Sequence, residues 1–206
     1  MTKPAYMIIG IDIHNEGAMG PYAVGTMPIL ERYNAQVLAG TSNIEHVDGN
    51  WARKRVVLIK FPSMKHANAF WNAPEYTSLK LLREDSSEQD NMLVEGMMDE
   101  DPNAPADEGT PYYMLGLNDM KSADWVPEYQ EKVPPIAAKF GVQGLAAGDQ
   151  FQMLDGDCPR GSMVLLKFPS EQKFKDFWFG KEYAAMKKLR EDNTESDHIG
   201  FPGVVE

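Results

Sequence analysis

The sequence predicts an α+β fold built from two similar halves, and an internal repeat is the first reason. A shift of 107 residues places residues 4–96 on residues 111–203 without a gap, and 31 of the 93 aligned pairs are identical. The second reason is the order of strand-like and helix-like segments within each copy. A repeat of this length is a whole small domain, because the units that build solenoids are about 20–50 residues long.

The first half of each copy predicts a strand, a helix and a second strand. Residues 5–13 form a short apolar run rich in isoleucine, which is typical of a buried strand. Apolar residues at helical spacing predict a helix over residues 18–33. Pro28 lies inside it, and an interior proline costs about 3 kcal/mol, so we expect a kink or a break there. Loose alternation predicts a strand over residues 36–47, and the Asp48-Gly49 pair that follows is typical of a hairpin turn.

The second half of each copy predicts a strand, a helix and a last strand. Residues 55–61 are apolar and β-branched, which favours a strand. Ser63 is a suitable N-cap for a helix that is interrupted at residues 72–74 and resumes at Glu75. Residues 91–96 predict the last strand. The second copy predicts the same order: strand 112–120, helix 124–140, strand 142–154, strand 162–168, helix 170–192 and strand 197–203.

The order β-α-β-β-α-β is that of a ferredoxin-like unit. Both helices lie on one face of such a sheet, and an uncovered apolar face of that size is not stable alone. We therefore expect two tandem ferredoxin-like units, residues 1–97 and 111–206, packed sheet to sheet as an intramolecular α+β barrel. Residues 98–110 are acidic, contain two prolines and read as an exposed linker.

The composition excludes some classes of protein. The formal net charge is −11, which argues against non-specific binding to nucleic acid or anionic membranes, because both need clustered Lys and Arg. Cys158 is the only cysteine, so no disulfide can form within the chain. The apolar run at residues 5–13 is too short to span a bilayer and lacks the features of a signal peptide. We expect a cytoplasmic protein that associates with neither membranes nor nucleic acid.

Several motifs resemble a known family. The segment 55–63 (RVVLIKFPS), followed by Phe70-Trp71, Glu75-Tyr76 and Arg83, resembles the DUF1330 family of the dimeric α+β-barrel superfamily, and the second copy carries the same motifs. The resemblance covers nearly all of each copy and implies two ferredoxin-like halves that form one barrel within the monomer. It supplies no catalytic set. Relatives in the superfamily include cofactor-free monooxygenases, isomerases, cyclases and haem-binding enzymes, so the fold does not fix the function.

The sequence departs from the family pattern at the second strand. The usual glycine pair before it is replaced by Asn34-Ala35 and Gly141-Val142, and the usual arginine within it is missing from both copies. Lys60 and Lys167 stand where an acidic residue is common before Phe-Pro-Ser.

Three residues are candidates for acid–base catalysis. Asp12 and its equivalent Asp119 end the first strand of each copy, where a carboxylate at the rim of an apolar pocket can act as a base. The alternative is that each caps the following turn. His46, near Glu45, could be a base or a metal or haem ligand. The alternative is a surface histidine, since the second copy has Met153 there.

Four aromatic residues are candidates for substrate binding. Tyr22 and Tyr129 are equivalent in the two copies, as are Trp71 and Trp178, and they could line a pocket for a planar ligand. The alternative is core packing. Arg83 and Arg190, each followed by Glu-Asp, are interpreted as solvated helix ends, and the alternative is an anion clamp.

We therefore expect a protein that binds a small apolar or aromatic organic molecule. It would use no cofactor and could act by acid–base chemistry of the isomerase, lyase or monooxygenase type. The alternative is a non-catalytic binding or stress-related module with a packed barrel. No metal-ligand spacing such as Cys-x-x-Cys is present. The sequence leaves open whether the chain forms a homodimer.

Overall fold

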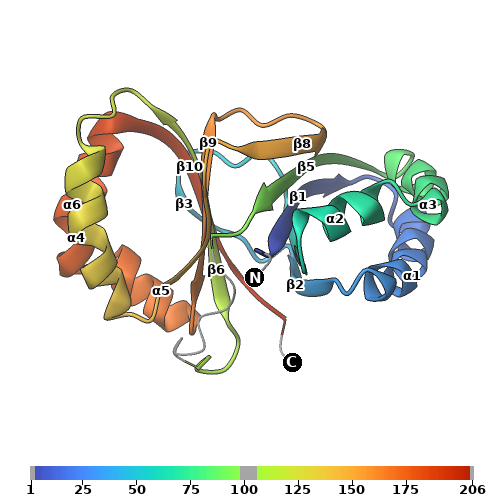
Figure 1. Cartoon of the computed structure of the whole chain (residues 1–206), viewed down its shortest axis with the longest axis horizontal. Helices are drawn as coiled ribbons and strands as arrows, with labels where there is room; N and C mark the ends of the chain where they lie inside the picture. The colour runs from blue at the N-terminus through green and yellow to red at the C-terminus, as the bar shows by residue number, and fades with distance from the viewer. Residues whose placement is uncertain (1–2, 98–105, 205–206) are drawn as a thin grey trace. The chain divides into compact units, whose positions relative to one another are not determined.

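The computed structural model of the chain describes residues 3–97 and 106–204. Residues 98–105 of the predicted linker lie outside the described residues. The described residues fold into two compact units, and each has one antiparallel five-stranded sheet and three helices (Figure 1). This confirms the predicted α+β class with two ferredoxin-like units.

The first unit has the strand order β2-β4-β1-β5-β8. Its strands are β1 (Ala5–Ile13), β2 (Gln36–Thr41), β4 (Arg55–Phe61), β5 (Ser87–Glu95) and β8 (Phe151–Asp155). Its helices are α1 (Glu16–Arg32), α2 (Met64–Trp71) and α3 (Pro74–Glu84).

The second unit has the equivalent order β7-β9-β6-β10-β3. Its strands are β3 (Glu45–Asp48), β6 (Tyr112–Met120), β7 (Gln143–Gly148), β9 (Ser162–Phe168) and β10 (Thr194–Pro202). Its helices are α4 (Val126–Ala138), α5 (Glu171–Trp178) and α6 (Lys181–Asn193).

Each unit takes one edge strand from the other repeat. Strand β3 belongs to the first repeat but pairs with β10, where His46 lies opposite Ile199. Strand β8 belongs to the second repeat but pairs with β5, where Met153 lies opposite Met92. The compact units therefore include residues 43–51 and 150–159 by exchange, and a repeat and a unit are not the same set of residues.

The helices of each unit cover one face of its sheet (Figure 1). In the first unit, alternate residues of β1 such as Met7 and Ile9 pack against Phe70 of α2 and Tyr76 of α3, as period-two alternation requires. Leu154 of the exchanged strand packs against this core. In the second unit, aromatic residues dominate the equivalent core: Tyr112, Phe168, Phe174, Phe177, Trp178 and Tyr183.

Most predicted elements are confirmed. The predicted strands 5–13, 55–61, 112–120 and 162–168 match β1, β4, β6 and β9 at both ends. Ser63 is the N-cap of α2, and its side chain accepts a hydrogen bond from the backbone N–H of His66. Where burial sets a strong local pattern, the sequence therefore places the element correctly.

The predicted strands 36–47 and 142–154 are wrong as single strands. Each is two strands that lie in different sheets, because its second half pairs with a strand distant in sequence. The Asp48-Gly49 turn consequently does not close a hairpin. The predicted helix 170–192 is also two helices, with a break at residues 179–180. Helix α1 continues through Pro28 to Arg32, and burial of Ile29 and Leu30 directly after the proline offsets its cost.

The turn that ends each exchanged strand requires glycine. Gly49 has φ +65°, and a Cβ atom there would lie 1.9 Å from the Ser196 carbonyl oxygen. Gly156 has φ +71°, and a Cβ atom would lie 2.3 Å from the Gln89 carbonyl oxygen. The backbone of each turn therefore rests directly on the neighbouring strand, and only glycine permits this approach.

We expect the substitutions Gly49→Ala and Gly156→Ala each to lower the free energy of unfolding by at least about 2 kcal/mol, through left-handed strain and backbone overlap. Gly40→Ala in β2 is the matched control, because a Cβ atom there meets nothing within 4 Å. Urea denaturation measures all three variants. Equal free energies of unfolding for Gly49→Ala and Gly40→Ala would show that the turn accommodates a Cβ atom without loss of stability.

Candidate functional site

Each unit buries an arginine near the end of a helix. Arg83 of α3 is 1% exposed and Arg190 of α6 is 5% exposed. The interpretation of both as solvated helix ends is therefore wrong. A buried guanidinium needs a charged partner and hydrogen bonds, and an aspartate at the end of the exchanged strand supplies the charge in both units.

The first cluster consists of Tyr22, Trp71, Tyr76, Lys80 and Arg83. Arg83 Nη2 donates to Asp155 Oδ2 over 2.5 Å, and its guanidinium lies 5.2 Å from the centroid of the Trp71 ring. Lys80 Nζ lies 3.8 Å from the same centroid and donates to the Trp71 carbonyl. Burial lowers the pKa of Lys80, and the charge of Arg83 acts in the same direction. Two cations therefore contact one indole ring.

The second cluster consists of the equivalent residues Tyr129, Trp178, Tyr183, Lys187 and Arg190. Arg190 Nη1 donates to Asp48 Oδ2 over 3.0 Å, and its guanidinium lies 5.2 Å from the Trp178 centroid. Lys187 Nζ lies 5.0 Å from the same centroid. The two clusters thus share residue types and arrangement.

A tyrosine pair completes each cluster. The hydroxyl groups of Tyr22 and Tyr76 are 2.9 Å apart, and those of Tyr129 and Tyr183 are 2.5 Å apart. Burial raises the pKa of Tyr76, Tyr129 and Tyr183. These hydroxyl groups therefore stay protonated at neutral pH and can donate a hydrogen bond.

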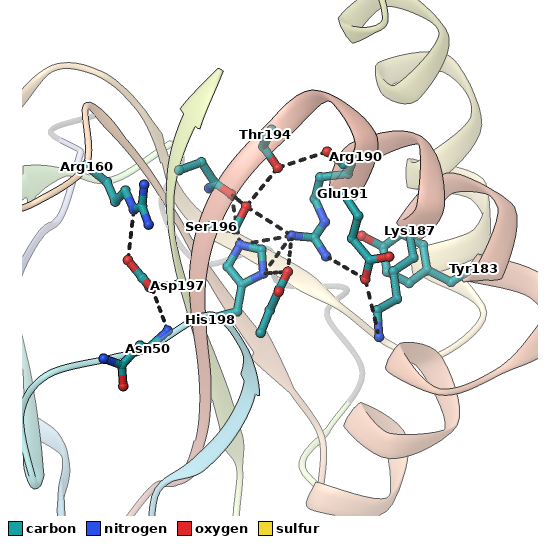
Figure 2. A network of polar contacts seen from close by, with 12 residues as sticks. Asn50, Arg160, Tyr183, Lys187, Arg190, Glu191, Thr194, Ser196, Asp197 and His198 are labelled. Atoms are coloured by element: carbon teal, nitrogen blue, oxygen red, sulfur yellow. Dashed lines mark hydrogen bonds and ion pairs between the residues drawn. The ribbon is translucent and has the colours of Figure 1, made fainter. Parts of the chain in front are cut away.

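The second unit adds a buried histidine network (Figure 2). His198 of β10 is 1% exposed, with Nδ1 at 2.8 Å from Arg190 Nη1 and Nε2 at 2.9 Å from Asn118 Oδ1. Arginine can only donate and a carbonyl oxygen can only accept, so Nδ1 accepts and Nε2 carries the proton. Ser196 Oγ also donates to Asn118 Oδ1, over 2.8 Å. The network therefore fits a neutral imidazole.

The charge states in the second unit follow from burial. Burial lowers the pKa of His198 below its ordinary 6.5, and Arg190 acts in the same direction while Asp48 opposes both. Contact with His198 lowers the pKa of Asp48 to about 2, helped by Arg190 and opposed by burial. At neutral pH the network holds a neutral imidazole, a carboxylate and a guanidinium.

The described residues of the first unit form no counterpart of this network. Asn91 takes the place of His198, Ile11 that of Asn118 and Gln89 that of Ser196. Asn91 is buried and its amide donates to Gln89 Oε1 over 3.4 Å. Of the two equivalent positions, only the one in the second unit places a titratable ring beside the buried arginine.

Several buried donors have no hydrogen-bond acceptor among the described residues. They are Arg83 Nη1, Arg190 Nε, Arg190 Nη2 and the indole nitrogens of Trp51 and Trp178. Native proteins contain few buried donors that lack an acceptor, so each of these five groups needs a physical explanation. Three of the five belong to the second cluster.

The predicted aspartates lie near the ends of β1 and β6, and among the described residues neither is seen to contact a residue of the two clusters. Asp12 Oδ1 accepts from the backbone N–H of Lys54 over 3.0 Å, and Oδ2 lies 3.6 Å from Arg53. Asp119 Oδ1 accepts from the backbone N–H of Gly161 over 2.7 Å, and Arg160 donates to its other oxygen. Each aspartate therefore binds the end of a loop, at the residue directly before β4 or β9.

The other predicted site residues are placed differently. His46 is exposed on β3 and is not part of the network around Arg190. Tyr22 and Trp71 lie in the first cluster, and Tyr129 and Trp178 lie in the second. The structure brings the four aromatic candidates together with the buried arginines, and it keeps Asp12, His46 and Asp119 apart from them.

Sequence reasoning missed Asp48, Asn118 and His198 and misread Arg190. One signal was available: Asp48, Lys80 and Arg83 are each identical to the residue 107 positions later, Asp155, Lys187 and Arg190. Identical charged residues at matching places in both copies indicate a shared role. No such signal exists for His198, because the first copy differs there.

Within residues 3–97 and 106–204, no group of three or more His, Cys, Asp or Glu side chains is arranged to hold a metal ion. The helices of the described residues are also too short or too polar to cross a membrane.

A known family matches both copies. The family described as a domain of unknown function, DUF1330, matches residues 4–97 and 111–204. None of the curated proteins matches the chain in sequence.

Solved structures share the fold over the whole chain. A candidate monooxygenase from Fusobacterium nucleatum is 8% identical with a TM-score of 0.58, covering 100% of this chain and 94% of its own. An anthrone oxidase-like protein is 10% identical with a TM-score of 0.55, covering 99% and 92%. A mutant chlorite dismutase from Candidatus Nitrospira defluvii is 8% identical with a TM-score of 0.57, covering 95% and 90%. Such low identities establish a common fold and nothing finer.

We expect His198 to make the stability of the protein depend on pH. Its folded pKa lies below the unfolded value, so below about pH 6.5 the unfolded chain binds a proton that the folded chain excludes. The free energy of unfolding then falls with decreasing pH, by at most about 1.4 kcal/mol per pH unit, until the folded pKa is reached. Denaturant unfolding between pH 7.5 and pH 5 measures this slope.

His198→Asn is the matched variant, because asparagine occupies the equivalent position in the first unit. It should remove the part of the slope that is due to His198. If wild type and variant lose stability in parallel over this range, the imidazole is not excluded from protonation in the folded state.

Proposed function

The chain belongs to the DUF1330 family, and we propose that it binds a small planar organic molecule at its two clusters. The observation that carries the proposal is the duplication of the clusters. All five residue types, and the aspartate that pairs with the arginine, are identical in the two copies, although the copies agree at only 31 of 93 positions.

Packing alone does not require this identity. Neighbouring core positions differ freely between the copies, as Ala67 and Phe174 or Leu30 and Ala137 do. A packed interior needs apolar residues of suitable volume, whereas the clusters retain hydroxyl groups, an indole ring and two cations. Aromatic faces with a few polar groups suit a flat conjugated ligand.

A second candidate function is acid–base turnover in the second unit without a cofactor. The buried His198 network favours it, because a neutral imidazole beside a guanidinium and a carboxylate is an arrangement that active sites use. The reaction would be of the isomerase, lyase or monooxygenase type. Asp12, His46 and Asp119 stay candidates for the proton-accepting group. The alternative is a non-catalytic binding or stress-related module.

Binding can be tested with 2-naphthamide, a neutral planar probe, by isothermal titration calorimetry. We expect Trp71→Phe and Trp178→Phe each to weaken or remove binding in their own unit, because stacking on an indole contributes about 1 kcal/mol beyond area burial. Trp51→Phe, which lies outside both clusters, is the control. The binding proposal fails if wild type takes up no probe, or if all three variants bind it as wild type does.

Turnover can be tested with anthrone, a planar ketone with an acidic C–H bond. One anthrone and one O₂ give one anthraquinone and one water, so oxygen uptake above the rate in buffer measures the reaction. General acid–base catalysis typically contributes about 10²–10⁴-fold, and we expect a loss of that order in His198→Asn.

The variants Asp12→Asn, His46→Ala and Asp119→Asn separate the strand-end candidates from the second cluster in the same assay. A large loss in one of them would move the proton-accepting group to that residue. A wild-type rate no faster than buffer, together with binding of 2-naphthamide, would favour the non-catalytic module.

A further inference from the structure

The two buried arginines differ in which N–H groups the protein itself uses. Arg190 makes its hydrogen bonds through Nη1, to Asp48 Oδ2, His198 Nδ1 and Ser196 Oγ. Its Nε and Nη2 groups are buried and make no hydrogen bond to an acceptor among the described residues, although the guanidinium lies close enough to the Tyr183 hydroxyl to oppose the rise in the pKa of that group. Arg83 instead uses Nη2 for Asp155.

The unused groups of Arg190 form one complete edge of the guanidinium. Nε and Nη2 lie on the side away from Nη1, and their N–H bonds point outward in parallel. This fork matches the two oxygens of a carboxylate. In Arg83 the buried group without an acceptor is Nη1, and one N–H of Nη2 is already used for Asp155, so the described residues do not leave the same edge whole.

The guanidinium of Arg190 is held firmly enough to act as a fixed receptor. Asp48 and His198 fix Nη1, and the face of the group lies over Trp178 at 5.2 Å. The indole nitrogen of Trp178, a residue 2% exposed, is a further buried donor without an acceptor among the described residues. Preorganised donors in a site of low dielectric bind anions more strongly than donors in water do.

A carboxylate of the protein itself lies close to this edge without occupying it. Glu191 Oε1 is 3.7 Å from Arg190 Nη2, which is too far for a hydrogen bond. The Glu191 side chain is 43% exposed, so it can turn into solvent and leave the edge to another carboxylate. Lys187 Nζ lies 3.9 Å from the same oxygen and supplies a second positive charge on this side.

We propose that the second unit binds an organic carboxylate, held in a bidentate manner by Nε and Nη2 of Arg190, with its planar part against the second cluster. The proposal deepens the proposed function and rests on it for the planar part of the ligand. It assigns the site to the second unit alone, with one ligand per chain. The class of ligand is an aromatic or otherwise conjugated carboxylic acid in its ionised form.

The test compares 2-naphthoate with 2-naphthamide, which share one ring system and differ in the carboxylate. Calorimetric titrations in a buffer free of carboxylates give both affinities. We expect wild type to bind 2-naphthoate at least about tenfold more tightly, as a charge-assisted fork implies. Arg190→Lys keeps the charge but removes the fork, and should abolish this preference. Arg83→Lys is the matched control and should keep it.

A second variant protects the test against a failure of Arg190→Lys to fold. Glu191→Gln changes an exposed side chain and removes the competing carboxylate, so it should tighten the binding of 2-naphthoate several-fold and leave that of 2-naphthamide unchanged. Glu84→Gln, at the equivalent position in the first unit, should change neither affinity. The Arg190 Nε–H resonance in a nitrogen–proton NMR spectrum should shift with benzoate and not with benzamide.

The outcomes separate this proposal from the proposed function. Equal affinities for the two naphthalene probes in wild type, no uptake of 2-naphthoate at millimolar concentration, or equal losses in Arg190→Lys and Arg83→Lys would each overturn the carboxylate site. If 2-naphthamide still binds in those cases, the planar-ligand function stands. A carboxylate preference that depends on Arg190, without turnover of anthrone, supports the site and favours the non-catalytic module.

Discussion

The structure depends on the ion pair between a buried helix arginine and an aspartate from the exchanged strand. Arg83 pairs with Asp155, and Arg190 pairs with Asp48. A guanidinium inside a protein is very costly without a partner, and removing one member of such a pair costs about 3–5 kcal/mol. Because each partner comes from the other repeat, neither repeat can satisfy its own arginine. The exchange of strands is therefore needed for the buried arginine of each cluster to have its charged partner.

The same constraint decides what the sequence could predict. Strands β1 and β4 were predicted with both ends correct, because an uninterrupted apolar run indicates a buried strand without any information from distant segments. Residues 36–47 were predicted as one strand because no local pattern records that residues 45–48 pair with β10. Arg190 was misinterpreted for the same reason. Arg-Glu-Asp at a helix end is typical of a solvated surface, and Arg190 can be buried only because Asp48 of the exchanged strand pairs with it. Both wrong predictions, the single strand over residues 36–47 and the solvated Arg190, have one cause, which is pairing between segments that are distant in the sequence.

The differences between the two units form a linked set rather than independent changes. A Cβ atom on Gly116 would lie 2.4 Å from Cδ2 of His198, so the histidine ring needs a glycine opposite it. The first copy has Ile9 and Asn91 at these places. Asn118 likewise brings a buried acceptor, which His198 and Ser196 satisfy. A half-satisfied polar network is worse than an apolar core, so these residues must change together.

This linked set also determines which ligand each unit can hold. In the second unit, His198 Nδ1 and Asp48 both engage Nη1 of Arg190 and leave the opposite edge of the guanidinium whole. In the first unit there is no imidazole at position 91, Asp155 uses one N–H of Arg83 Nη2, and the buried group left without an acceptor is Nη1. A fold shared with proteins of several chemistries does not select a ligand. The Nε and Nη2 edge of Arg190 can select a ligand, because a carboxylate binds to two parallel donors and a neutral ring does not need them.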